Sequence, residues 1–152
     1  MTTTGARPLS VRRTGVVVWI LLACGAGVLL YEALVVVNGV SVDDLQRGPG
    51  HDPGTAPPGR DGDVAVAGHR TTYGAPFLHL DSLRCRDRVL LTDRRGRLFT
   101  DEVARQRVVA PTDVWVIGEH PLGTVGPALT LMTCNTRFSA EQRLIVHAEL
   151  VS

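Results

Sequence analysis

A series of short apolar runs, rich in β-branched residues and separated by turn-forming residues, restricts the fold more than any other feature of this sequence. The runs cover residues 64–67, 89–92, 97–103, 107–110, 114–117, 129–133 and 143–150. Repeated short strands with turn signals between them are typical of a β-sandwich or β-barrel. Because the chain has 152 residues, it has room for one such domain and one accessory segment. We therefore predict an all-β fold, with a short helix at residues 76–83.

The runs also predict local geometry. Residues 89–92 and 97–103 are joined by the sequence DRRG, which predicts a hairpin in which Gly96 supplies a positive φ. In the run 143–150, every second residue from Leu144 is apolar, so this set forms one face of a strand and Arg143 belongs to the other. The same period separates Cys134 from the apolar face of its own run, so we expect its thiol to face a groove.

The N-terminal part of the chain has a different character. Residues 15–37 are almost entirely apolar, interrupted only by Glu32, and this run is long enough to cross a bilayer as a helix. Three arginines and no acidic residue precede it, which by the positive-inside rule places the N-terminus in the cytoplasm. We expect a cytoplasmic tail at 1–14, an uncleaved transmembrane signal anchor at 15–37, and an extracellular domain at 38–152. A cleaved signal peptide is the alternative, but its apolar core is usually shorter.

Charge and cysteine content exclude several classes of function. The net charge of +1 provides no general attraction to nucleic acid, so we expect no nucleic-acid partner. The three cysteines have no CxxC spacing and are odd in number, which indicates neither a disulfide framework nor a zinc knuckle. The histidines outside the motif described next also lack a metal-binding spacing such as HExxH; they are His51, His79, His120 and His147. We expect no metal and no cofactor.

Three positions carry residues suited to nucleophilic catalysis. His69 follows a short apolar run in GDVAVAGHRTTYGAPF, Cys134 ends the segment TLMTC, and Arg143 opens the run after it. Each residue has an ordinary interpretation when taken singly, because a histidine after a strand is commonly a loop residue, a thiol is commonly a small buried apolar group, and an arginine is commonly a solvated charge. No aspartate has a spacing that assigns it as a third member of a catalytic triad.

Taken together, these elements resemble the sortase family, whose pattern is a histidine after an apolar strand, a TLxTC strand, and an arginine opening the next strand. The resemblance extends over residues 38–151. Its specific parts are GPGHDPGT (48–55), AGHRTTYGAPF (67–77), TLMTC (130–134) and SAEQRLIVHAEL (139–150). These details are most similar to class E sortases.

The resemblance implies a sortase-like β-barrel with short helices and a cysteine transpeptidase activity outside the cell. Cys134 would attack the threonyl carbonyl of an LPXTG- or LAXTG-like C-terminal sorting signal and form a thioester. His69 would protonate the leaving glycine amine and later deprotonate the incoming cell-wall precursor amine. Arg143 would bind the oxyanion or the substrate backbone. Tyr73 and Thr133 are candidate substrate contacts.

One departure from the family pattern keeps alternatives open. The usual stalk and opening barrel strand are missing between the predicted membrane helix and the first matching residue, so we expect a barrel one strand short, for which residues 32–37 could substitute in part. A truncated sortase-like module that binds without turnover is therefore one alternative. A sortase that joins pilin subunits through a lysine amine is another. The expected partners of the favoured enzyme are secreted proteins with a sorting signal, a cell-wall amine, and the membrane.

Overall fold

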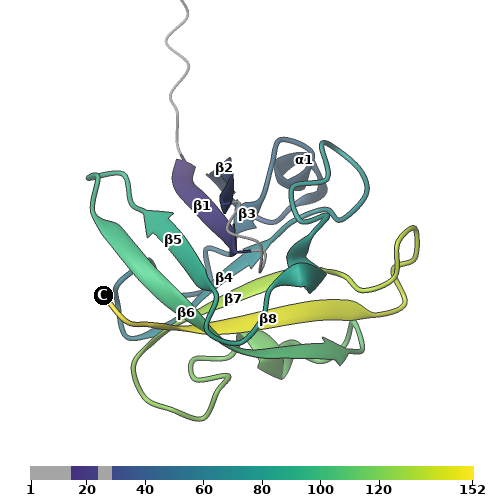
Figure 1. Cartoon of the computed structure of the whole chain (residues 1–152). Helices are drawn as coiled ribbons and strands as arrows, with labels where there is room; N and C mark the ends of the chain where they lie inside the picture. Colours follow the sequence, from purple (N-terminus) through teal and green to yellow (C-terminus); the bar gives the residue numbers. More distant parts are fainter. Residues whose placement is uncertain (1–14, 24–28) are drawn as a thin grey trace, which may run out of the picture.

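Strand pairing closes a β-barrel in the computed structural model, which describes residues 15–23 and 29–152 (Figure 1). The strands are β1 (Gly15–Ala23), β2 (Leu29–Asn38), β3 (Gly50–His51), β4 (Gly62–Ala67), β5 (Arg88–Thr92), β6 (Leu98–Val109), β7 (Pro127–Cys134) and β8 (Arg143–Leu150). Their order around the barrel is β1-β2-β3-β4-β7-β8-β6-β5. The helical elements are α1 (Val42–Leu45), η1 (Leu80–Ser82) and η2 (Val114–Ile117). The predicted all-β barrel with short helices is confirmed.

Most of the predicted strands are present, with two differences. The runs 97–103 and 107–110 form one strand, β6, in which the pairing with β8 shifts register between Val103 and Arg105. The run 114–117 was predicted as a strand and is the 3₁₀ helix η2 instead. A run of four apolar residues cannot distinguish a strand from a helical turn by periodicity. The helix predicted at 76–83 is limited to Leu80–Ser82.

The predicted hairpin between β5 and β6 is confirmed. Gly96 has a φ of +79°, which an L side chain rarely adopts. The carboxylate of Asp93 accepts hydrogen bonds from the backbone N–H groups of Arg95 and Arg97, both at 2.9 Å. The turn is therefore fixed by its own side chain as well as by glycine.

The N-terminal strands complete the barrel that was expected to be one strand short. β1 pairs along its whole length with β2 and also pairs with β5, from Val17↔Thr92 to Ile20↔Val89. These strands occupy the described part of the range 15–37, where the sequence had predicted a transmembrane helix; residues 1–14 and 24–28 lie outside the described chain. Val-rich stretches such as 16–18 and 35–37 suit a strand because β-branched side chains pack well on a pleated surface. In residues 15–23 and 29–152 there is no helix with the length and apolar character that a membrane span requires.

The hydrophobic core fills the barrel interior and is capped by the segment that includes η1. Its members from the strands include Val36, Val66, Leu131 and Val146, and the capping side chains are Phe77, Leu80 and Leu83. Strand β8 was expected to bury one face, but Ile145 and His147 of the opposite face are also buried. Both faces are covered because η2 packs nearby, with Val116 only 3% exposed.

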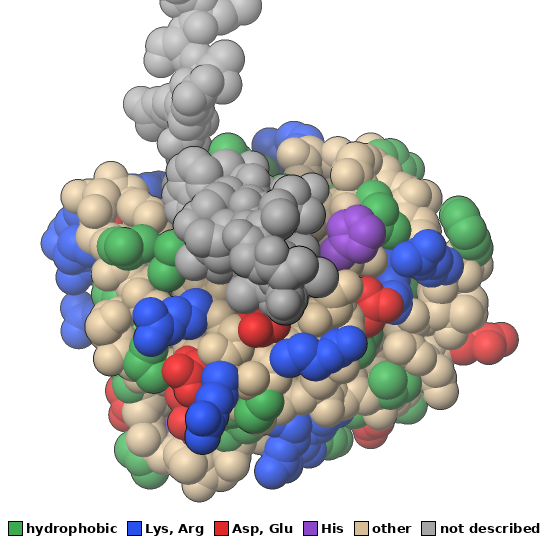
Figure 2. All heavy atoms as spheres, in the orientation of Figure 1, with side chains coloured by type: hydrophobic (Ala, Val, Ile, Leu, Met, Phe, Trp, Pro, Cys, Tyr) green, Lys and Arg blue, Asp and Glu red, His purple; other side chains and the backbone are tan. Residues whose placement is uncertain are grey.

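The surface carries charges of both signs. Arginine and acidic side chains are interspersed on the face shown in Figure 2, as a net charge of +1 implies.

Candidate active site

Two parallel strands bring the predicted nucleophile and the predicted base to one edge of the barrel. β4 and β7 pair in parallel up to Ala67↔Met132, and Gly68 N–H donates to the carbonyl of Met132 at 3.0 Å. His69 and Cys134 therefore leave the sheet at the same end. Both side chains line one cleft of about 350 Å³. The other residues that line it are Arg70, Thr71, Thr72, Phe138, Ser139 and Ala140.

Arg143 lies directly across the sheet from Cys134. The two residues are register partners in the antiparallel pair of β7 and β8. Nη1 of Arg143 lies 3.9 Å from Cys134 Sγ and donates to the carbonyl of Ala140 at 2.8 Å. The structure thus brings together all three residues that the sequence singled out, with a permanent positive charge beside the thiol.

The imidazole of His69 is oriented by the loop that follows β4. Its Nδ1 lies 3.1 Å from Thr72 Oγ1, at hydrogen-bonding distance. Its Nε2 is buried and has no hydrogen-bond partner among the described residues. Within residues 15–23 and 29–152, no carboxylate is hydrogen-bonded to His69; Asp63 instead accepts from Thr130, and Asp81 accepts from Arg70. An imidazole held through one nitrogen has the other available for proton transfer.

The two candidate substrate contacts have different environments. Tyr73 is 53% exposed and its ring lies 4.9 Å from the His69 ring, centroid to centroid. Thr133 is buried, and its hydroxyl donates to the carbonyl of Gly68 at 2.8 Å. Neither residue is among those that line the cleft. Thr133 thus links the two strand ends, whereas Tyr73 packs on the imidazole at the surface.

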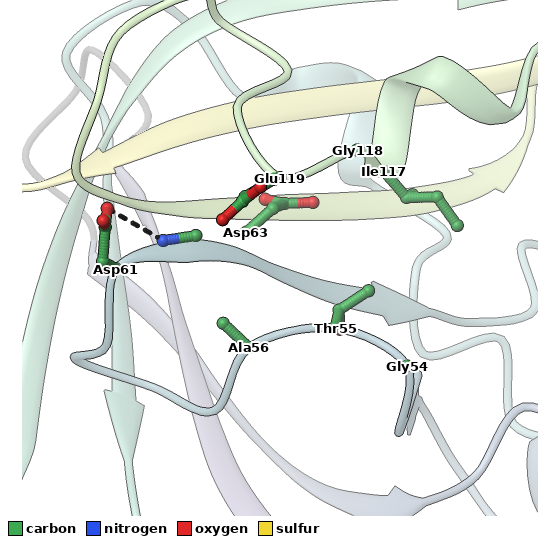
Figure 3. A pocket seen from close by; sticks show the side chains of 9 residues that line it. Gly54, Thr55, Ala56, Asp61, Asp63, Ile117, Gly118 and Glu119 are labelled. Atoms are coloured by element: carbon green, nitrogen blue, oxygen red, sulfur yellow. Dashed lines mark hydrogen bonds between the residues drawn. The ribbon is translucent and has the colours of Figure 1, made fainter.

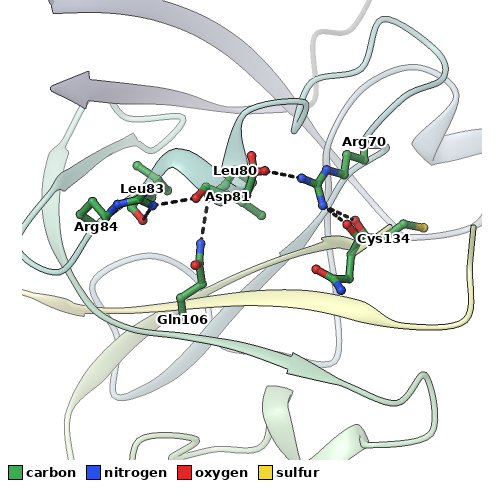
Figure 4. A network of polar contacts seen from close by, with 8 residues as sticks. Arg70, Leu80, Asp81, Leu83, Arg84, Gln106 and Cys134 are labelled. Carbon is green, nitrogen blue, oxygen red and sulfur yellow. Dashed lines mark hydrogen bonds and ion pairs between the residues drawn. The ribbon is translucent and has the colours of Figure 1, made fainter. Parts of the chain in front are cut away.

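The sequence reasoning missed the part of the site that follows His69. Arg70 is buried and donates to the backbone carbonyls of Cys134 and Asn135 and to the carboxylate of Asp81 (Figure 4). It also missed the cleft wall formed by residues 138–140. The only sequence signal for Arg70 was its place beside His69 in the motif AGHRTTYGAPF.

The other described cysteine, Cys85, does not contribute to the cleft. Cys85 is exposed. Its thiol lies 3.3 Å from the carbonyl of Ala104, the residue at the register shift within β6. It does not line the cleft. Cys24 lies outside the described residues.

Comparison with known proteins decides the family. The sortase domain model matches residues 29–151. The chain belongs to the sortase family. Sortases are cysteine transpeptidases, the class of enzyme that the motifs predicted.

Similar proteins support the more detailed resemblance to class E. Sortase SrtE1 of Streptomyces coelicolor is 31% identical over 100 residues, which are 62% of this chain and 28% of that protein. The chain therefore matches only part of that protein's length. Sortase E from Streptomyces avermitilis has a structure with a TM-score of 0.76 and 37% identity, covering 90% of this chain and 87% of that one. The structure of sortase E1 from S. coelicolor with a tripeptide in the active site has a TM-score of 0.77 and 26% identity, covering 92% and 90%.

A second buried polar cluster lies on the outer face of the sortase barrel wall, where the Thr130 hydroxyl contacts the carbonyl of Val116 in η2. Thr130 Oγ1 donates to Asp63 Oδ1 at 2.9 Å and lies 2.9 Å from His147 Nδ1. Burial raises the pKa of Asp63 and of Asp101 to about 7. Burial, with the nearby charges of Arg107 and Arg105, lowers the pKa of His147 to about 4. We therefore expect a neutral imidazole at His147 at pH 7.

This cluster adjoins a separate cavity of about 330 Å³. Asp63 lines it together with Asp61 and Glu119, and Asp61 accepts a hydrogen bond from Gly62 N–H (Figure 3). The described residues contain no group of three or more histidine, cysteine or acidic side chains arranged to hold a metal ion. The cavity lies apart from the cleft at Cys134, since the two share no lining residue.

Proposed function

We propose that this sortase cleaves a C-terminal sorting signal between threonine and glycine and transfers the protein to a cell-wall amine. The observation that carries the proposal is the arrangement at the end of β7. His69 and Cys134 line the same cleft, and Arg143 Nη1 lies 3.9 Å from the thiol. A nucleophile and a base in one cleft, with a fixed cation beside the nucleophile, match the needs of acyl transfer.

The chemistry follows from these three groups. The thiolate of Cys134 attacks the threonyl carbonyl, the carbon–oxygen double bond opens to an oxyanion, and Arg143 stabilises the negative charge. His69 protonates the glycine nitrogen through Nε2 as the carbon–nitrogen bond breaks, which leaves a thioester on Cys134. His69 then removes a proton from the incoming amine, whose attack on the thioester releases the thiol.

The surroundings of the cleft fit an extended peptide that carries an apolar residue. Arg143 lines a second, small apolar cavity of about 80 Å³, together with residues that include Met132, Val114 and Val116. We assign it to the leucine of an LPXTG- or LAXTG-like signal, because burying one aliphatic side chain contributes about 1.5 to 3 kcal/mol. The tripeptide in the active site of the S. coelicolor sortase E1 supports the proposal that the substrate is a peptide.

The location that we propose is the outer side of the cell membrane, where sorting signals and cell-wall amines are accessible. The arginines before residue 15 and the apolar range 15–37 are the basis for a cytoplasmic N-terminus and a single span. The same range supplies β1 and β2, and one copy of the segment cannot be both a membrane helix and two barrel strands. Alkaline carbonate extraction of membranes distinguishes the membrane helix from the barrel strands, because a protein with a spanning helix stays in the lipid fraction after extraction.

The experiment that tests the proposed reaction offers sorting-signal peptides together with two amines. Peptides with LPXTG and LAXTG are incubated with the protein and either a cell-wall-type amine or a lysine side-chain amine, and the products are identified by mass spectrometry. Cys134→Ala should abolish cleavage, and Cys85→Ala should retain most of it. A lysine-linked product alone would indicate a pilin-joining sortase. Absence of any thioester on Cys134 would indicate a binding module and overturn the proposal.

A further inference from the structure

The guanidinium of Arg70 connects the two chain segments that carry the proposed catalytic residues. Its side chain is 6% exposed. Nη1 donates to the carbonyl of Cys134 at 3.2 Å and also to the carbonyl of Asn135, and Nη2 donates to Asp81 Oδ2 at 2.6 Å (Figure 4). One side chain thus bonds to the residue that bears the nucleophile, to the residue after it, and to η1.

A second connection lies on the other side of the same pair. The hydroxyl of Thr133 donates to the carbonyl of Gly68 at 2.8 Å. Gly68 and Arg70 are the chain neighbours of His69, and Thr133 and Asn135 are those of Cys134. Each neighbour of His69 therefore bonds to the segment around Cys134, so side-chain-to-backbone hydrogen bonds lie on both sides of the two proposed catalytic residues.

We propose that Arg70 is a positioning residue that fixes the end of β7, and hence the Cys134 thiol, relative to His69. The effect that we expect on catalysis rests on the proposed function. Arg70 does not act on the substrate itself, since its Nη1 and Nη2 atoms are engaged with the protein, whereas Arg143 lies beside the thiol. The functional need is geometric, because a misplacement of about 1 Å between reacting groups can reduce a rate about 100-fold.

An arginine suits this role better than any other residue. Its planar guanidinium presents donors in fixed directions and can serve two carbonyls and a carboxylate at once, whereas a lysine ammonium is a compact point charge. Asp81 neutralises the buried charge, which would otherwise be costly to remove from water. The carbonyls of Cys134 and Asn135 lie at the end of a strand, where the ladder no longer supplies all their donors.

The test compares three variants, each of which replaces a single arginine. Arg70→Gln removes the charge and the fork, and Arg70→Lys keeps only the charge. Arg84→Gln is the matched control, because Arg84 also donates to backbone carbonyls, those of Asp81 and Leu83, but not to β7. Circular dichroism and thermal melts establish folding for each variant, and peptide cleavage gives kcat and KM.

We expect Arg70→Gln to lower kcat about 10- to 100-fold while KM changes by less than about twofold, since the substrate contacts remain. The kcat of Arg70→Lys should lie between that of Arg70→Gln and that of the unmodified protein, and Arg84→Gln should keep near-normal turnover. If Arg70→Gln does not fold, Arg70→Lys carries the test. Turnover within about twofold of normal in a folded Arg70 variant, or an equal loss in Arg84→Gln, would overturn the inference.

Amide hydrogen exchange tests the inference independently of turnover. Arg70→Gln should speed exchange in a peptide covering residues 133–138 by about tenfold or more and leave peptides from the middle of β8 unchanged. Arg84→Gln should leave both unchanged. If the unmodified protein cleaves no sorting peptide, the proposed function fails. Unchanged amide exchange at residues 133–138 in Arg70→Gln would instead disprove the positioning role of Arg70.

Discussion

The buried carboxyl of Asp101 leads to a prediction about stability and pH. Asp101 is 3% exposed, and its Oδ2 has no hydrogen-bond partner among the described residues. Burial raises its pKa from 3.8 to about 7. The folded protein therefore holds a proton that the unfolded chain releases between pH 4 and pH 7. In that interval the folded state binds more protons than the unfolded state, so the free energy of unfolding must fall as pH rises.

The magnitude follows from the size of the shift. A difference of one pH unit in pKa corresponds to about 1.4 kcal/mol, so a shift of about three units removes roughly 4 kcal/mol between pH 4 and pH 8. Asp101→Asn keeps the shape but has no proton to lose. We expect this variant to match the unmodified protein at pH 4 and to be more stable by up to about 4 kcal/mol at pH 8.

Asp101→Asn removes this group and also the Asp101 charge that helps to raise the pKa of Asp63, so both effects act in the same direction in the comparison. His147 has a lowered pKa and acts in the opposite direction, because its stabilising effect increases as pH rises from about 4 to 6.5. It is present in both proteins, so its contribution cancels. Urea denaturation followed by circular dichroism at pH 4, 5.5, 7 and 8 gives the free energies, and Glu141→Gln, at an exposed carboxylate, is the control. A stability difference between Asp101→Asn and the unmodified protein that does not grow with pH would refute the reasoning.

Other perturbations give separate tests. A chain that begins at Asn38 lacks β1 and β2, including the buried Val36, and should lose about 3 to 6 kcal/mol and cooperative melting; an unchanged calorimetric transition would contradict the barrel closure. Gly68→Ala places a Cβ 2.7 Å from a ring carbon of Phe77, so urea titration should show a loss of about 1 to 3 kcal/mol. Arg143→Gln should lower kcat about 100- to 1000-fold, and an effect on KM alone would exclude an oxyanion role. Protease added to intact cells should digest residues 38–152 if the domain is extracellular.

Much of the barrel could be predicted because its strands carry their own signals. Alternation and turn residues placed β4, β5, β7 and β8 within a few residues of their observed ends. The prediction failed at 114–117, where four apolar residues fit a strand as well as a 3₁₀ turn. Whether such a segment forms a strand or a 3₁₀ turn depends on what it packs against, which is here the outer side of the barrel. The residues of the segment itself do not reveal that packing.

The N-terminal range shows a different limit of sequence reasoning. An apolar stretch at residues 15–37, interrupted only by Glu32, is compatible with a membrane helix and also with two strands of a barrel. The structure distinguishes them by the environment of successive residues, since Val36 is fully buried whereas Val35 is 56% exposed. Val35 and Val36 are the same residue type, so composition could not reveal this alternation. Only the pairing partners of β1 and β2 determine it.

The candidate catalytic residues could be located from the sequence, but the contacts that hold them in place could not. Motifs located His69, Cys134 and Arg143, because each motif is local in sequence. The role of Arg70 depends on carbonyl groups 64 and 65 residues away, whose positions exist only after β4 and β7 have paired. A buried arginine beside a histidine looks the same in sequence as an exposed one.

One pairing therefore explains why two residues 65 positions apart can act together. In a parallel pair the C-terminal ends of both strands lie at the same edge, so residues that follow the last paired positions are close whatever their separation in sequence. The last partners are Ala67 and Met132, and the two candidate residues come two positions after each of them. An antiparallel arrangement of the same strands would place His69 and Cys134 at opposite edges. The direction of the β4–β7 pair is thus the condition for the site, and the bonds made by Gly68, Arg70 and Thr133 fix the distance within it.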